Sequence, residues 1–288
     1  MSAKFPIIAV TGSSGSGTTR SQPLFERMFT ELGVRAGFVE GDSFHVYDRE
    51  QSQSMLERAR VRGENFSHFG PAANYWDRLE ALFEQFGESG TGMVRRYLHT
   101  EADAQSARQN VGTFTPWGPM APADVLFYEG LHGGVVVPEI DIARHADLLI
   151  GMTPTVNLEW IQKIHRDTNE RGYDAEAVAH TILRRMPDYV TYITPQFSRT
   201  DVNFQRVPLV DTSNPFIVRD VPAAEESLVV VHMNPHSRLD VDFYELLTDI
   251  PDTFLSRPDT LVVRGEHMEL AMELTLKPAL ERLIKNRR

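Results

Sequence analysis

The chain has 288 residues, a formal net charge of −11 and no cysteine. Its 41% hydrophobic content is enough for a buried core and excludes a globally disordered chain. The missing cysteines exclude disulfides, thiolate metal sites and thiol catalysis, and the negative charge argues against nucleic-acid binding. No apolar stretch approaches the ~20 residues that cross a membrane, and the N-terminus lacks a secretory pattern, so we expect a cytoplasmic protein without a membrane partner.

The N-terminal segment reads as a strand, a glycine-rich turn and a helix. Residues 5–11 form an apolar run, residues 12–19 read GSSGSGTT, and residues 21–32 have apolar side chains four apart. Such a turn can direct successive backbone N–H groups at a phosphate, with a helix N-terminus behind them. The predicted nucleotide site comprises Gly12, Ser13, Ser14, Gly15, Ser16, Gly17, Thr18 and Thr19.

This turn departs from the usual phosphate loop, G-x-x-x-x-G-K-[ST], because Thr18 stands in place of the lysine. It could be a glycine-serine turn without a ligand, a dead loop, or a loop that takes its cation from elsewhere. The candidate cations are Arg20 and Lys163, and Lys163 is the only lysine between residues 5 and 276. Thr19 matches the hydroxyl that binds Mg²⁺, and Glu129 matches the acid that ends the Walker B strand.

Strands and helices alternate along the rest of the chain. We expect strands at 35–40, 123–130, 146–152, 204–211 and 227–233, and helices at 49–62, 71–86, 155–171, 174–190 and 266–287. Thr155 is the expected N-cap of its helix, and residues 100–121 are expected to form an exposed loop. The alternation predicts an α/β, P-loop nucleoside-triphosphate-hydrolase-like fold, a mainly parallel sheet with helices on both faces. Without a linker or repeat, residues 1–288 are expected to form a single domain, although the length permits two.

Two clusters of charged residues are candidates for chemistry. Asp42, His45 and Arg49 follow the second strand, where doubly wound sheets gather their functional residues, although Asp42 could also serve as a helix cap. The second cluster comprises Lys163, Arg166 and Asp167, with Arg171 one turn later. Their helical spacing puts the side chains on one face, which is either a functional site or a solvated salt-bridged surface. A carboxylate beside an acceptor hydroxyl, together with cations for anionic groups, is what a kinase needs.

Several segments together resemble the phosphoribulokinases of the bacterial type, over nearly the whole chain. The most specific are FYEGLHG at 127–133 and EWIQKIHRD at 159–167, together with GSSGSGTT and VEGDSFH at 39–45. The lysine-free loop is itself similar to that of this family, so it does not argue for a dead enzyme. The resemblance implies transfer of the γ-phosphoryl of ATP, carried with Mg²⁺, to the 1-hydroxyl of ribulose 5-phosphate in Calvin-Benson carbon fixation.

The resemblance also implies roles for individual residues. Asp42 would be the base, Asp167 would support turnover, and Lys163 and Arg166 would face the transferring phosphoryl group. Glu129 would be the Walker B acid. His45, Arg49 and Arg171 would serve the sugar phosphate, while His99, Arg184 and Arg185 match positions linked with substrate binding or regulation. Bacterial members of the family resemble homo-octamers that NADH activates and AMP inhibits, so NADH is a possible allosteric activator here.

Two other functions fit parts of the pattern. A related P-loop kinase could act on a nucleoside such as uridine or on another small hydroxyl substrate, which is neutral and needs no phosphate ligands such as Arg49. A nucleotide-sensing protein without catalysis would explain the missing lysine. The two kinases differ in their acceptor, and the sensor would release no ADP.

Overall fold

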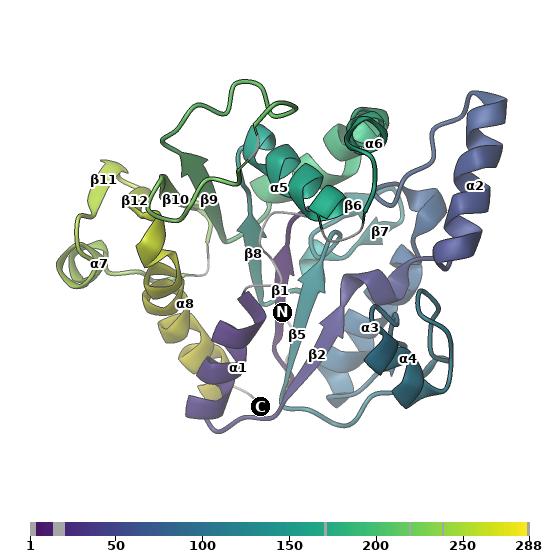
Figure 1. Ribbon diagram of the computed structural model, residues 1–288. Coiled ribbons are helices and arrows are strands. Elements are labelled where there is room, and N and C mark those ends of the chain that lie inside the picture. Colours follow the sequence, from purple (N-terminus) through teal and green to yellow (C-terminus); the bar gives the residue numbers. More distant parts are fainter. Residues whose placement is uncertain (1–3, 14–20, 170–171, 219, 238, 287–288) are drawn as a thin grey trace.

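The computed structural model describes residues 4–13, 21–169, 172–218, 220–237 and 239–286. Its centre is an eight-stranded sheet in which five neighbouring strands are parallel and the last three pair antiparallel. The strands are β1 (Ile7–Thr11), β2 (Ala36–Glu40), β5 (Val125–Gly130), β8 (Leu148–Met152), β9 (Val202–Pro208), β10 (Ser227–Met233), β11 (Phe254–Arg257) and β12 (Thr260–Arg264). They lie in the order β11-β12-β10-β9-β8-β1-β5-β2 (Figure 1). Two short pairs lie outside this sheet, β3 (Met93–Val94) with β4 (Gly118–Pro119) and β6 (Val136–Val137) with β7 (Ile140–Asp141).

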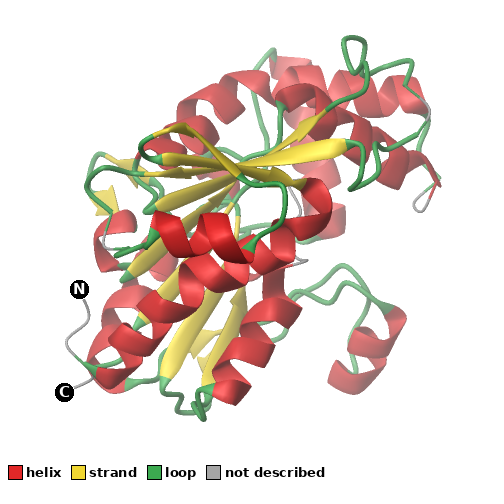
Figure 2. Ribbon diagram, turned by 90° about the vertical axis from the view of Figure 1, so that its left-hand side faces the viewer, coloured by secondary structure: helices red, strands yellow, loops and turns green. Residues whose placement is uncertain are grey.

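Helices cover both faces of the sheet (Figure 2). They are α1 (Ser21–Glu31), α2 (Arg49–Arg62), α3 (Trp76–Ser89), α4 (Glu101–Ala107), α5 (Val156–Asn169), α6 (Ala175–Asp188), α7 (Phe243–Asp249) and α8 (Met268–Lys285). Successive residues of β1 point to opposite faces, so Ile8 packs with α1, α7 and α8, whereas Ile7 packs with α3. The expected α/β class, with a mainly parallel sheet between helical layers, is therefore confirmed.

The parallel part of the sheet brings separate segments to one edge. β1 lies between β5 and β8, and β2 pairs with the outer side of β5, all in parallel. The chain segments that leave these four strands therefore emerge together, and α5 and α6 lie above that edge in Figure 1. In open α/β sheets this edge is where ligands bind.

Some local expectations were wrong. The expected loop at 100–121 contains α4, which begins with a capping box between Thr100 and Asp103, and also β4. The helix expected from Pro71 is a 3-10 turn at Pro71–Ala73 followed by α3, which starts at Trp76. The expected cap Thr155 has a buried hydroxyl that finds no hydrogen-bond partner among the described residues.

Other segments agree closely with the expectation. α2 and β10 have the expected bounds. The hairpin of β11 and β12 and the helix α7 were not expected. In the described ranges, no helix has the length and apolar character of a membrane span.

Candidate active site

The phosphate loop leaves β1 beside the end of β5. Gly12 donates its backbone N–H to the carbonyl of Gly130 at 3.2 Å, and Ser13 is buried. The buried Gln196 amide fixes the base of this loop: its oxygen accepts from the Thr11 hydroxyl at 2.9 Å. The expected site residues Ser14, Gly15, Ser16, Gly17, Thr18 and Thr19, the candidate cation Arg20, and Arg171 lie outside the described residues.

The turn that carries Asp42 packs tightly against the end of β5. It is a short 3-10 helix, Gly41–Phe44, that directly follows β2. A Cβ atom on Gly41 would lie 2.6 Å from the Tyr128 hydroxyl and 2.9 Å from the Cα of Gly130. The two backbones come so close that only glycine fits at position 41. The Asp42 turn therefore lies beside Glu129, which pairs in register with Glu40 of β2.

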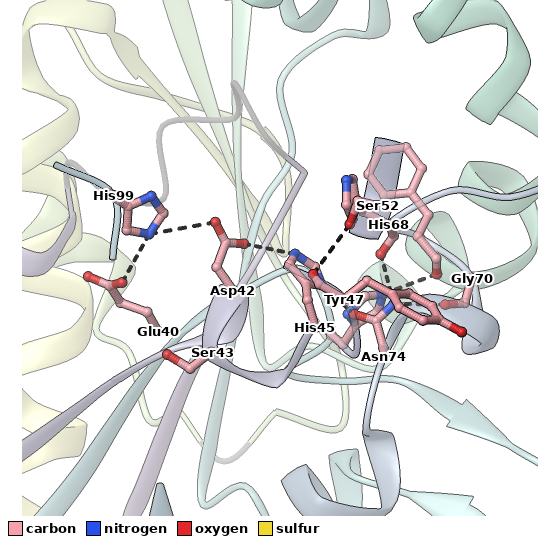
Figure 3. Close-up of polar contacts among 12 residues, drawn as sticks. Glu40, Asp42, Ser43, His45, Tyr47, Ser52, His68, Gly70, Asn74 and His99 are labelled. Carbon is pink, nitrogen blue, oxygen red and sulfur yellow. Dashed lines mark hydrogen bonds and ion pairs between the residues drawn. The ribbon is translucent and has the colours of Figure 1, made fainter. Parts of the chain in front are cut away.

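Asp42 contacts two histidines rather than capping a helix. Its Oδ1 lies 3.2 Å from Nε2 of His45, and its Oδ2 lies 3.8 Å from Nε2 of His99 (Figure 3). Burial opposes ionisation of Asp42, but the hydrogen bond to His45 and the charges of His45 and His99 hold its pKa well below the usual range. Asp42 is therefore ionised at neutral pH, and 45% of its side chain is exposed.

His99 joins this cluster from the segment between β3 and α4. Its Nε2 lies 3.4 Å from a carboxylate oxygen of Glu40. The hydrogen bond to Glu40 raises the pKa of His99. Burial acts in the opposite direction but is the weaker effect, and the charge of Asp42 raises the pKa further. The resemblance suggested His99 with little detail, and the structure brings its ring next to Asp42.

Arg95 holds the backbone of the Asp42 turn through hydrogen bonds. Its Nε donates to the carbonyl of Ser43 at 2.8 Å, and an Nη donates to the carbonyl of His45. Its guanidinium lies over aromatic rings, 3.6 Å from the ring centre of Phe114 and 4.7 Å from that of Trp117. Nothing in the sequence marked Arg95, because its partners are backbone carbonyls about fifty residues away.

The second cluster lies on α5, as its spacing predicted. Lys163 donates to Oδ2 of Asp167, and Nε of Arg166 donates to its Oδ1 at 3.2 Å. Asp167 is only 5% exposed, so the cluster is not a solvated salt-bridged surface. Burial lowers the pKa of Lys163 to about 8, with a further contribution from Arg185, although Asp167 acts in the opposite direction.

Glu159, one turn before Lys163, was not singled out from the sequence. It is 5% exposed, and its Oε2 accepts a hydrogen bond from the Tyr189 hydroxyl at 3.0 Å. Burial raises the pKa of Glu159 to about 7 against the opposing effect of that hydrogen bond. A glutamate in an amphipathic helix looks like a surface residue, and only the packing of α5 on Tyr189 shows otherwise.

Residues 66–70 connect the two clusters. The ring of His68 lies 4.8 Å from that of His45, and burial with the nearby charges of His45 and Arg185 lowers the pKa of His68 to about 3. Arg185 also acts on Lys163. From α6, Arg184 donates to the carbonyl of Phe66. The loop is thus contacted by His45 of the first cluster and by α6, whose Arg185 acts on Lys163 of the second cluster.

Arg49 is the remaining predicted ligand. It is the first residue of α2, is exposed, and packs beside Gly112, whose carbonyl accepts its backbone N–H at 2.9 Å. No contact joins its side chain to Asp42 or His45 in the described structure.

A cavity of about 230 Å³ lies beside the Asp42 turn. The residues that line it include Glu40, Arg95, His99 and Glu129.

The middle one of the five parallel strands leads into a glycine-rich loop, and the neighbouring strand ends in an acid with a second carboxylate beside it. These features define the class of P-loop kinases. Residues 7–213 match the family described as phosphoribulokinase / uridine kinase. The chain belongs to this family.

The similarity to named relatives extends over the whole chain. The chain is 55% identical to a plasmid-borne phosphoribulokinase of Cupriavidus necator and 49% identical to a phosphoribulokinase of Rhizobium meliloti. Each alignment covers 100% of this chain and 99% of the relative. The solved structure of phosphoribulokinase from Rhodobacter spheroides superposes with a TM-score of 0.90 at 46% identity, covering 99% of both chains.

Proposed function

We propose that the chain transfers the γ-phosphoryl group of ATP to the 1-hydroxyl of ribulose 5-phosphate, giving ribulose 1,5-bisphosphate and ADP. The supporting observation is similarity along the full chain, at 49–55% identity, to proteins named phosphoribulokinase. The site agrees with this reaction, because Asp42 is ionised beside the phosphate loop and cations lie across the same edge. The reaction belongs to the Calvin-Benson cycle of carbon fixation.

The nucleotide is held at the glycine-rich loop. Backbone N–H groups of residues 13–19 bind the β-phosphate, and the N-terminus of α1 adds its positive end. Thr19 and Glu129 would hold the Mg²⁺ that accompanies ATP, and the ion would offset the negative charge of the phosphates. The described residues hold no group of three or more acidic or histidine side chains that could bind a metal by itself. Glu129 as one carboxylate ligand fits, because Mg²⁺ bound with a nucleotide needs only one or two from the protein.

Asp42 acts on the acceptor hydroxyl. It is ionised at neutral pH, so it accepts a hydrogen bond from the hydroxyl, orients the attacking oxygen, and takes its proton as the phosphoryl group moves. Lys163 and Arg166 stabilise the charge on the transferring group, and Lys163 supplies the cation that the loop lacks. Asp167 holds both cations in place through the contacts described above.

The phosphate of the sugar needs cations at the other end of the acceptor. His45, Arg49 and Arg171 serve this purpose, and His45 reaches it from the Asp42 turn. A uridine kinase would not need these three residues, because a nucleoside carries no phosphate.

The resemblance to the bacterial enzymes extends to assembly and regulation. The chain forms a homo-oligomer, an octamer by resemblance to the bacterial enzymes, and NADH activates it. Residues 1–288 form a single domain, because one sheet contains both the N-terminal strand β1 and the C-terminal hairpin β11–β12.

The test is a coupled assay of ADP release with a panel of pentose phosphates and nucleosides, with and without NADH. We expect ribulose 5-phosphate to give the highest kcat/KM. Higher kcat/KM with uridine would favour the nucleoside kinase, and no acceptor-dependent ADP release would favour the nucleotide sensor.

A further inference from the structure

Asn74 makes the contacts that decide which nitrogen of His45 carries hydrogen. Asn74 is only 7% exposed and begins the segment that leads into α3. Its Nδ2 donates to the carbonyl of His68 at 2.8 Å and to that of Gly70 at 2.7 Å. Carbonyl oxygens only accept, so both hydrogens of the amide are used there and its orientation is fixed.

The amide oxygen consequently faces His45. Oδ1 of Asn74 lies 2.8 Å from Nδ1 of His45 (Figure 3). An amide oxygen only accepts, so Nδ1 must carry a hydrogen to make this bond. The other ring nitrogen, Nε2, lies 3.2 Å from Oδ1 of Asp42.

The ring of His45 therefore lies between two acceptors. A neutral ring has one N–H, and Asn74 already uses it, so Nε2 would present a lone pair to the Asp42 carboxylate. Only the doubly protonated ring donates to Asn74 and to ionised Asp42 together. The arrangement favours a positively charged His45 whenever Asp42 is ionised.

The backbone holds these side chains at the right separation. His45 and Asn74 form an isolated antiparallel bridge, in which Tyr75 donates its N–H to Phe44 and Val46 donates to Ala73, each at 2.8 Å. These bonds do not involve the Asn74 side chain, so a substitution there leaves the bridge intact.

We propose that Asn74 is a positioning residue that fixes a hydrogen on Nδ1 of His45, keeps that ring positively charged, and turns Nε2 toward Asp42. The charged ring provides a cation for the anionic acceptor and keeps Asp42 ionised. The hydrogen on Nδ1 of His45 is inferred from the contacts alone, whereas the role of the charged ring toward the acceptor rests on the proposed function.

Other ionisable groups also act on the His45 ring. They are Asp42 on its own turn, His68 on the loop that stacks on it, His132 after β5, and Arg95, which donates to the His45 carbonyl. Asn74→Ala removes none of these four side chains, but it also removes the hydrogen bonds to the carbonyls of His68 and Gly70, so its effect has to be compared with that of a second variant that loosens the same loop.

The first measurement is the protonation of His45 in the wild-type protein, by ¹⁵N-histidine NMR or neutron diffraction at pH 7. We expect a hydrogen on Nδ1 in the wild type, and in Asn74→Ala a neutral ring with its hydrogen on Nε2. A wild-type ring without hydrogen on Nδ1 overturns the proposal, whether or not the variant folds and whichever acceptor the protein uses.

The second measurement is the pH profile of the KM for ribulose 5-phosphate. Without the Asn74 acceptor, the ring no longer needs a hydrogen on Nδ1, so we expect the KM for ribulose 5-phosphate to be higher in Asn74→Ala. The loss of this one hydrogen bond should raise the KM up to about tenfold, with a smaller change in kcat.

Ser67→Ala is the matched control. Ser67 holds the same loop through its hydrogen bond to Asp188 at 2.6 Å but does not touch His45. We expect Ser67→Ala to lower thermal stability and leave both the His45 hydrogen and the KM profile unchanged. If both variants shift the KM profile alike, or Asn74→Ala leaves it unchanged, Asn74 has only a structural role.

Discussion

The two charged clusters at the edge of the sheet are held in different ways. Asp42 lies on a four-residue turn, and its position depends on contacts from distant segments: Gly130 below it, His99 beside it and Arg95 behind it. Lys163 and Asp167 belong to one helix and hold each other. The comparison indicates that the Asp42 turn is positioned by tertiary packing, whereas the α5 cluster is positioned by local helix geometry.

The largest expected effect is that of Asp42→Asn. The amide cannot take the proton of the acceptor, so we expect kcat to fall about 10²-fold or more. The KM for ATP should change little, because the phosphate loop is untouched. Steady-state kinetics measure both. The matched control is Asp77→Asn, which changes an exposed carboxylate on α3; near-native kcat in Asp42→Asn would contradict its role as the base.

Lys163→Ala should have a similar effect through a different cause. Its removal leaves the buried Asp167 without one of its cations and the transferring phosphoryl without charge stabilisation, so we expect a loss in kcat of about 10²-fold. Lys277→Ala is the control, since Lys277 forms an ion pair with Glu31 at 2.6 Å between α1 and α8. Equal rates for the two variants would mean that Lys163 does not replace the missing lysine of the loop.

The pH dependence of kcat separates the clusters further. Burial lowers the pKa of Lys163 to about 8, so its positive charge is present below that pH and is lost above it. We expect kcat to fall up to about tenfold per pH unit well above pH 8 if the charge is required. Lys163→Arg keeps its charge and should remove this alkaline decline, whatever its rate at pH 7. An identical decline in both proteins would assign it to another group.

A smaller effect is expected on stability from Glu159. Its pKa of about 7 in the folded protein lies above the ordinary value of 4.5. The folded state therefore holds this proton more tightly, and the resulting stability is complete below pH 4.5 and is lost as the pH rises through 7. Glu159→Gln should flatten the fall of Tm between pH 5 and 7.5, on the order of a few °C. Parallel Tm curves for the two proteins would contradict this.

The sequence was a good guide wherever the determining interactions are local. The glycine-rich turn, the acid that ends β5 and the face shared by Lys163 and Asp167 follow from spacing along one segment. α4 could also have been predicted, because Thr100 and Asp103 have the spacing of a capping box. The exposed strand β11 lacks an apolar pattern, since it lies at the edge of the sheet.

The parts of the site that the sequence did not reveal all depend on long-range contacts. Asn74 meets His45 across 29 positions, and Arg95 meets the carbonyl of Ser43 across 52. Neither residue type is unusual for a turn or a short strand. Their importance comes from which backbone atoms and rings the folded chain brings within hydrogen-bond distance, which spacing along one segment does not show.

The most direct test of the account is identification of the products that the purified protein makes from ATP and ribulose 5-phosphate. Phosphorus NMR of the reaction mixture distinguishes a sugar bisphosphate from inorganic phosphate. The account predicts ribulose 1,5-bisphosphate and ADP in equal amounts, with formation of both slowed strongly in Asp42→Asn. ADP with inorganic phosphate and no bisphosphate, or a bisphosphate formed equally fast by Asp42→Asn, would contradict it.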